Sequence, residues 1–234
     1  MSPTKEPPQN IDAVYYRDGV DTSLAMRMLK TARLAMFKLF MAEMQPTATT
    51  RILDIGVSDD ENDGANFLEK LYPWQRNITC AGIGNGDAVK SAYPEITFQH
   101  ITPGAKLPFA DARFDIACSN AVIEHVGGSA QRMTFISEHL RVAKAVFITF
   151  PNRWFPVEHH TSLPLLHFSP KLFRKVLAGG KYDYWIDPAN MDFLDKRIVA
   201  RDWPAGARKP SKVITTGLSL GPFSSNVAII VRPD

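Results

Sequence analysis

Histidine and carboxylate side chains gather at two places in this chain of 234 residues. Glu124 and His125 follow an apolar run, and Glu158, His159 and His160 stand together later in the chain. Histidine has an unperturbed pKa near ~6.5 and therefore exchanges protons at neutral pH. A carboxylate can do the same where its surroundings raise its pKa. Glu124, His125, His159 and His160 are our candidates for catalytic residues, with a general base among them.

The segment that contains the second group has two interpretations. In the first, Asn152, Arg153 and Trp154 line a substrate pocket, and the Arg153 guanidinium holds an anionic group. In the second, the segment is a structural lid, and His159 and His160 only bind backbone groups. Loops at such a position carry function often enough to keep the first interpretation.

The sequence does not favour a metal site. The acidic run 59–63 offers the oxygen ligands that calcium and magnesium prefer, but it lacks the spacing of a calcium-binding loop. A solvated turn near a helix N-terminus fits it better. Adjacent side chains such as His159 and His160 point to opposite sides of an extended segment, and no cysteine stands beside them. We therefore expect no metal.

Apolar strands that alternate with helices must position these side chains. Residues 51–56, 78–83, 96–100, 114–119 and 145–150 are predicted strands, and 66–71, 87–93 and 129–142 are predicted helices, the last capped by Ser129. Such alternation, with nearly continuous apolar strands, predicts an α/β domain with a parallel sheet covered on both faces.

The pattern changes after Pro151. Helices are predicted over 169–177 and 192–201. Two strand-like runs, 213–220 and 227–231, flank Gly221-Pro222 and predict a hairpin at one edge of the sheet, which adds an antiparallel strand.

The end of the first strand predicts a ligand site. Asp54 and Gly56 come just before a polar turn. In open α/β sheets, ligands bind outside the carboxyl ends of the strands, near the switch in strand order. Glycine lets the backbone approach a ligand closely, and the Asp54 carboxylate can accept hydrogen bonds from turn amides.

Composition limits the class of protein. Hydrophobic residues make up 45% of the chain, enough for a substantial core, and 27 basic against 24 acidic residues give a charge of +3, too small to indicate nucleic-acid binding. Cys80 and Cys118 fall in predicted strands and indicate buried thiols, not a disulfide framework. No run reaches the length of a membrane span, so a cytoplasmic location is the default expectation.

A helix predicted over 21–44 precedes the alternation. Its apolar residues share one face, and Arg27, Lys30 and Lys38 lie largely elsewhere. We expect this helix to pack on the domain, and weak contact of its basic side with a membrane surface is the alternative. The apolar face consists of Leu29, Ala32, Met36, Phe37, Phe40 and Met44.

Four motifs in order carry a family resemblance. They are Asp54-x-Gly56, Leu107-Pro108-Phe109, Phe114-Asp115 and the Asn-Ala-Val-Ile-Glu-His run at 120–125. Together they resemble the class I S-adenosylmethionine-dependent methyltransferase family, especially its small-molecule and lipid-modifying members, over about residues 51–150. The resemblance implies a Rossmann-like, doubly wound, mostly parallel seven-stranded sheet with an antiparallel strand in the C-terminal hairpin.

The resemblance also implies S-adenosylmethionine as cofactor and a set of residues around it. The methionine end would lie against Asp54, Gly56, Val57 and Ser58, and the ribose against Asn85. The adenine would lie near Leu107 and Pro108, and the sulfonium near Asn120 and Ala121. The implied division of the chain is an N-terminal tail (1–20) and a single domain (21–234), made of the helix 21–44, a cofactor-binding core (51–150), a substrate or lid region (151–210) and the hairpin (211–234).

Three features depart from the family pattern. Gly56 is not followed by further close glycines, and residues 101–104 replace the acidic residue that commonly precedes Leu107. At the end of the second strand, Asn85 stands near the usual ribose-binding acid, with Asp87 close by. A lost charge-assisted hydrogen bond weakens binding by about 1.5–3 kcal/mol.

These observations predict a methyltransferase that acts on a small-molecule or lipid-like acceptor, with no nucleic-acid partner. The departures keep one alternative open, a non-catalytic binding domain with the methyltransferase fold. A dinucleotide-dependent oxidoreductase would need Gly-x-Gly-x-x-Gly after the first strand and an acid after the second, and the sequence has neither.

Overall fold

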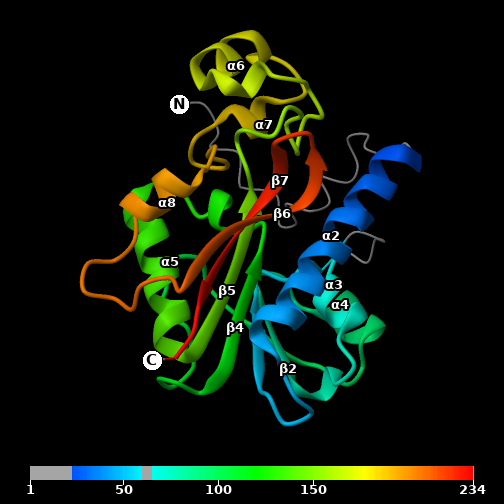
Figure 1. Cartoon of the computed structure of the whole chain (residues 1–234), viewed down its shortest axis with the longest axis vertical. Coiled ribbons are helices and arrows are strands. Elements are labelled where there is room, and N and C mark those ends of the chain that lie inside the picture. The colour runs from blue at the N-terminus through cyan, green and yellow to red at the C-terminus, as the bar shows by residue number, and fades with distance from the viewer. Residues whose placement is uncertain (1–22, 60–64, 234) are drawn as a thin grey trace.

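A computed structural model describes residues 23–59 and 65–233. Helices and strands alternate along the chain as far as β5, except between β3 and β4, and a hairpin follows at the C-terminal end (Figure 1). In order they are α2 (Ser23–Met44), β1 (Ile52–Ile55), α3 (Phe67–Leu71), η1 (Gln75–Asn77), β2 (Ile78–Gly82), α4 (Asp87–Ala92), β3 (Thr97–His100), β4 (Phe114–Asn120), η2 (Ile123–His125), α5 (Ser129–Val142), β5 (Ala143–Pro151), η3 (Leu166–Phe168), α6 (Pro170–Leu177), α7 (Asp183–Ile186), α8 (Lys196–Arg201), β6 (Lys212–Leu220) and β7 (Phe223–Val231). The predicted tail, 1–20, lies outside the described residues.

One seven-stranded sheet has the order β3-β2-β1-β4-β5-β7-β6. β1 pairs in parallel with both β2 and β4, and its Ile52 stands opposite Ile78 on one side and Ile116 on the other. The strand order therefore reverses between β1 and β4, where α/β sheets bind ligands. β7 is antiparallel to β5 and β6, so the predicted C-terminal hairpin is confirmed.

Two helical layers cover the sheet, and side chains alternate between them. Cys80, Cys118 and Phe147 face the layer of α2, α3 and α4, whereas Val146 and Ile148 face α5 and α8 (Figure 1). Both cysteines are buried and free, as predicted. The apolar stripe of α2 is also confirmed, because its Phe40 is buried and packs edge-on against Phe147, with ring centroids 5.4 Å apart.

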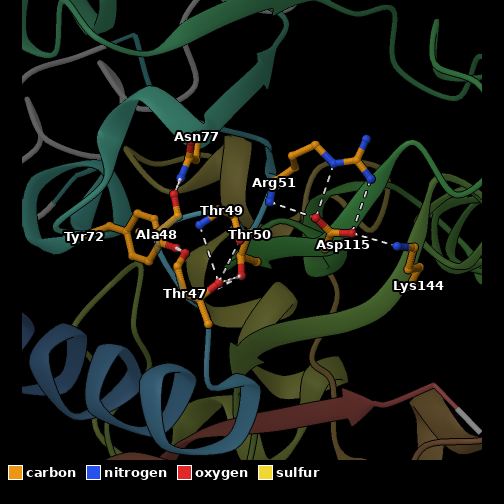
Figure 2. A network of polar contacts seen from close by, with 9 residues as sticks. All are labelled: Thr47, Ala48, Thr49, Thr50, Arg51, Tyr72, Asn77, Asp115 and Lys144. Carbon is orange, nitrogen blue, oxygen red and sulfur yellow. Dashed lines mark hydrogen bonds and ion pairs between the residues drawn. The ribbon is translucent and has the colours of Figure 1, made fainter.

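A polar network ties the amino ends of the central strands together (Figure 2). The Asp115 carboxylate accepts hydrogen bonds from the backbone N–H of Arg51, at 3.0 Å, and from its guanidinium. The Lys144 ammonium binds the same carboxylate at 2.9 Å. One side chain of β4 thus holds the starts of β1 and β5, at the edge opposite the predicted ligand site.

A small helical cap stands over the carboxyl ends of the strands. It is formed by η3, α6 and α7 and has a core of its own, in which Phe173, Trp185, Met191 and Phe193 are buried (Figure 1). The cap lies within the region 151–210 that the sequence assigned to a lid or substrate segment.

Two local predictions were wrong. Ser129 is the first residue of α5 and Gly128 takes the capping position, because the Ser129 hydroxyl instead donates to the Asp202 carboxylate at 2.7 Å. The last helix is shorter than the predicted 192–201, because Asp195 caps it by accepting from the backbone N–H groups of two residues that follow. Among the described residues, no helix is long and apolar enough to span a membrane.

Candidate functional site

The turns after β1 and β4 meet at the point where the strand order reverses. Gly56 has a φ of +90°, and a Cβ there would collide with the Val122 side chain. Ala121 holds a φ of +55°, which is strained for a residue other than glycine. Two unusual backbone conformations side by side form the bare edge that a ligand could approach.

Asp54 lies below this edge and is buried beside another carboxyl group. Its neighbour is Glu69 of α3, which is fully buried and accepts a hydrogen bond from the Cys80 thiol at 3.1 Å. Burial, followed by the charge of Glu69, raises the pKa of Asp54 well above its usual value. The two carboxyl groups therefore share a proton, and the Asp54 side chain is turned towards α3.

Asn85 and Asp59 lie at the end of β2. Asn85 forms a local turn, in which its carboxamide oxygen accepts from the Asp87 N–H and its NH₂ donates to the Asp87 carboxylate. Asp59, in the turn after β1, accepts from the backbone N–H groups of Gly86 and Ala88, both at 3.0 Å. Asp59 thus places a carboxylate at the start of α4, and the rest of the predicted acidic turn, 60–63, lies outside the described residues.

The loop predicted to lie near the adenine is fixed by α5. The Glu138 carboxylate accepts from the Leu107 N–H at 2.7 Å, and the Arg141 guanidinium donates to the Leu107 carbonyl at 3.0 Å. The Leu107 side chain is buried in the core, and Pro108 is exposed. At the end of β4, the Asn120 carboxamide oxygen accepts from the Thr149 hydroxyl at 2.7 Å, and this bond fixes its orientation.

A small cavity of about 20 Å³, room for roughly one water molecule, lies where β5 ends and the cap begins. Its wall includes residues of both predicted groups and of the region 151–210. The residues that line the cavity include Glu124, Asn152, Arg153, His159 and His160.

Glu124, His125 and His160 converge at this cavity. The two histidine Nε2 atoms are 3.2 Å apart, and a Glu124 carboxylate oxygen lies 3.8 Å from Nε2 of His125. Glu124 is 2% exposed, and neither of its carboxylate oxygens has a hydrogen-bond partner among the described residues. Burial raises its pKa to about 7.

A polar contact at Nδ1 orients each of the two imidazole rings. Nδ1 of His125 donates to the Asn190 carbonyl at 2.8 Å, and Nδ1 of His160 faces the Glu158 carboxylate at 2.9 Å. Burial disfavours the imidazolium of His160, but Glu158 outweighs it, so the pKa of His160 is raised. Burial and the charge of His160 lower the pKa of His125 to about 3. The two shifts favour His160 over His125 as the donor in the contact between the two Nε2 atoms.

The other predicted residues bind neighbouring elements. Nε2 of His159 lies 3.0 Å from the Ser225 carbonyl of β7, so His159 points away from His160 as expected for adjacent side chains. The Asn152 carboxamide donates to the Ser224 carbonyl. His159 and Asn152 thus join the cavity wall to the hairpin.

Arg153 and Trp154 stack on each other, with the guanidinium 4.7 Å from the ring centroid. The Trp154 ring donates to the Asp195 carboxylate at 3.1 Å and is 45% exposed. Nε of Arg153 is buried without a hydrogen-bond partner among the described residues. A cation with an unused donor therefore lines the cavity.

The sequence analysis missed Arg33, on α2. Its Nε and Nη1 atoms are buried and have no hydrogen-bond partner in the described chain. The charge of Arg33 lowers the pKa of Asp54 on one side, and those of Glu124 and His159 on the other. The sequence feature that could have indicated a buried cation is the position of Arg33 between Ala32 and Met36 on the buried stripe of the helix.

Comparison with known proteins places this arrangement in a class. Residues 80–146 match the family model of a methyltransferase domain. No curated protein sequence matches the chain. Solved structures share the fold, and we describe three of them.

A S-adenosylmethionine-dependent methyltransferase from Methanosarcina mazei is 17% identical, with a TM-score of 0.52 over 80% of this chain and 94% of that one. Geranyl diphosphate C-methyltransferase from Streptomyces coelicolor, solved with Mg²⁺, geranyl diphosphate and S-adenosylhomocysteine, is 11% identical, with a TM-score of 0.55 over 93% and 86%. The cyclase SpnF is 17% identical, with a TM-score of 0.51, and the match covers 82% of this chain but only 60% of that one.

The sheet order is the Rossmann-like order of the class I S-adenosylmethionine-dependent methyltransferase fold, and the matched segment, residues 80–146, lies within that sheet. The cofactor of that class is S-adenosylmethionine. At such low sequence identity, the solved structures establish the fold of this chain but not its reaction.

Proposed function

We propose that this protein transfers a methyl group from S-adenosylmethionine to a small-molecule or lipid-like acceptor. One observation carries the proposal: the strand edge at Gly56 meets Val122, two residues before Glu124, which lines a cavity together with His160. Arg33 links the two, because its charge acts on both Asp54 and Glu124.

The residues at the edge fit the cofactor. Gly56 is exposed and presents bare backbone to a ligand, and Arg33 offers two buried donors that suit the carboxylate of the methionine moiety. We assign the ribose to the end of β2, where Asn85 is exposed and Asp59 holds a carboxylate, and the adenine to the neighbourhood of Pro108. When bound, the cofactor supplies an activated methyl group on its sulfonium.

The chain's own part in the reaction is alignment. Methyl transfer needs the acceptor's nucleophile in line with the sulfonium at near-attack distance. In our proposal, Arg153, which lines the cavity, holds an anionic group of the acceptor, and the stacked Trp154 ring keeps the Arg153 guanidinium in place. Glu124 and His160 lie where the nucleophile would enter, and their low exposure, 2% for Glu124 and 7% for the His160 side chain, limits the access of water.

A non-catalytic binding domain is the second candidate. It is favoured by Asn85, which is engaged in its own turn and replaces the acid that would hold both ribose hydroxyls. The shared fold of the cyclase SpnF also shows that this architecture is not confined to proteins named as methyltransferases.

Calorimetric titration with S-adenosylmethionine and with S-adenosylhomocysteine separates the two candidates. We expect both ligands to bind with micromolar Kd, equivalent to about −8 kcal/mol. Replacing Gly56 with valine should abolish binding, because its side chain would collide with Val122 at a positive φ. The matched control is Gly206→Val, at another positive-φ glycine that has open space around it and lies outside the site.

Binding would then be followed by transfer of labelled methyl groups to a panel of anionic apolar acceptors. If the wild-type chain binds neither ligand, the proposal fails. Binding without transfer to any acceptor would favour the non-catalytic domain.

A further inference from the structure

We propose that Glu124, His125 and His160 form a binding site for one divalent transition-metal ion, with Zn²⁺ as the best fit. The inference goes beyond the proposed function, because the cluster needs no cofactor to bind a metal. It also departs from the sequence analysis, which tested His159 with His160 and found no reason for a metal. The structure pairs His160 with a residue 35 positions away instead.

The spacing of the ligand atoms suits a single ion. One atom from each of Glu124, His125 and His160 lies within 4.8 Å of the other two, and the two nitrogens are 3.2 Å apart. Two nitrogens bound to Zn²⁺ at ~2.0–2.1 Å in tetrahedral geometry would lie about 3.3 Å apart. The separation of the two nitrogens therefore already fits one ion, a tilt of the rings would aim both lone pairs at it, and a rotation of the Glu124 side chain would shorten its 3.8 Å separation from His125.

The Glu124 carboxylate points to a missing partner. A carboxylate with 2% exposure and no hydrogen bond from the described residues is costly to bury. Neighbouring His125 offers only a lone pair at Nε2, since its Nδ1 donates to the Asn190 carbonyl. A cation at the centre of the cluster would satisfy both groups.

The hydrogen-bond partners of the two histidine ligands are of the kind found at metal sites. Ligating histidines usually donate their second N–H to a carboxylate or a backbone carbonyl, which fixes the tautomer and the ring. Asn190 serves His125 in this way, and Glu158 serves His160. Glu158 is itself held by the backbone N–H and hydroxyl of Thr161, at 2.6 and 2.8 Å.

The set of ligands selects the metal. Two imidazoles and one carboxylate suit Zn²⁺ and related transition metals, whereas Mg²⁺ and Ca²⁺ prefer oxygen ligands. Glu124 and His160 both line the cavity. Three protein ligands with a fourth position open to a cavity are typical of reactive metal sites and not of structural ones.

Zinc titration of tag-free, chelator-treated protein tests the assignment. We expect one Zn²⁺ per chain, no comparable binding of Mg²⁺, and at least tenfold weaker Zn²⁺ binding in Glu124→Gln and in His160→Gln. His100→Gln, at an exposed histidine of β3, is the matched control and should bind like the wild type. No Zn²⁺ binding by the wild type, or equal binding by wild type and both variants, would overturn the proposal.

A second measurement covers variants that fail to fold. Co²⁺ added to the wild-type protein should give the strong visible absorption of a four- or five-coordinate ion, and Zn²⁺ should displace it. A weak spectrum typical of six-coordinate Co²⁺ would count against the site. Both titrations are made without S-adenosylmethionine, so failure here leaves the cofactor titration, and with it the proposed function, untouched.

Discussion

His139 of α5 makes the stability of the protein depend on pH. Its ring is 1% exposed, Nδ1 lies 2.8 Å from the Phe135 carbonyl, and Nε2 is buried without a hydrogen-bond partner among the described residues. Burial therefore lowers the pKa of His139 to about 4. Between its unfolded pKa near ~6.5 and pH 4, the unfolded chain binds the additional proton, so stability falls as the pH falls through that window.

We expect this residue alone to remove about 3 kcal/mol of unfolding free energy between pH 7 and pH 4. Denaturant titrations of the wild type and of His139→Leu at several pH values measure the effect. The variant should lose less stability than the wild type over this range, and the difference at pH 8 reports packing alone. Parallel curves for the two proteins would refute the role of His139.

Residue types in the site were predictable, but their contacts were not. Glu124, His125 and His160 stood out as proton-transfer groups, yet only the folded chain brings His125 within 3.2 Å of His160. A sequence pattern shows which residues are close along the chain, whereas the segment after β5 brings His160 next to His125 only in the folded structure. Arg33 was not predicted because its helix was divided only into an apolar face and exposed cations, and a buried cation belongs to neither.

At the scale of elements, Asp115 should matter for stability and not for ligand binding. Its carboxylate joins β1, through Arg51, to β5, through Lys144 (Figure 2). The Arg51 guanidinium holds the pKa of Asp115 well below its usual range. Because these side chains are partly exposed, we expect Asp115→Asn to cost only about 1 kcal/mol, or a fall in Tm of roughly 2–4 °C.

Calorimetry of Asp115→Asn with S-adenosylhomocysteine should give the wild-type Kd, since the network lies at the edge of the sheet opposite the site. Asp111→Asn is the control for stability, because the Asp111 side chain is 78% exposed and pairs, among the described residues, with Arg141. A control variant as unstable as Asp115→Asn would show that the network has no special role.

The elements themselves were mostly predictable from hydrophobic patterns. β1, β2, β4 and β5 have buried runs that long-range pairing only reinforces, and the stripe of α2 repeats with helical period. Prediction failed where side chains from elsewhere decide the local structure. Asp202 takes the hydroxyl of Ser129, and α7, a single turn held by Trp185 in the core of the cap, leaves too short a pattern to detect.

At the scale of the whole molecule, α2 connects the parts of the site. It packs on β5, β6, β7 and α3, so one helix spans the C-terminal hairpin and the half of the sheet around β1 (Figure 1). Near its end, Glu43 pairs with Lys212 and Arg232 of the hairpin region. Arg33 extends from the same helix towards Asp54 and Glu124, so the position of its charge depends on the packing of the entire domain.

Arg33→Met tests whether this charge serves a ligand or the fold. Methionine keeps the packing of the side-chain stem near Phe67, and the guanidinium atoms Nε and Nη1 have no hydrogen bond to lose in the described chain. The unfolding free energy of the ligand-free protein should therefore change by less than about 1 kcal/mol. Binding of S-adenosylhomocysteine should weaken about tenfold or more, because a charge-assisted bond to its carboxylate contributes roughly 1.5–3 kcal/mol. Arg27→Met, at an exposed position of the same helix, should change neither quantity. If Arg33→Met instead lowers Tm and leaves the Kd unchanged, Arg33 stabilises the helix, and the carboxylate of the cofactor must be held by other groups.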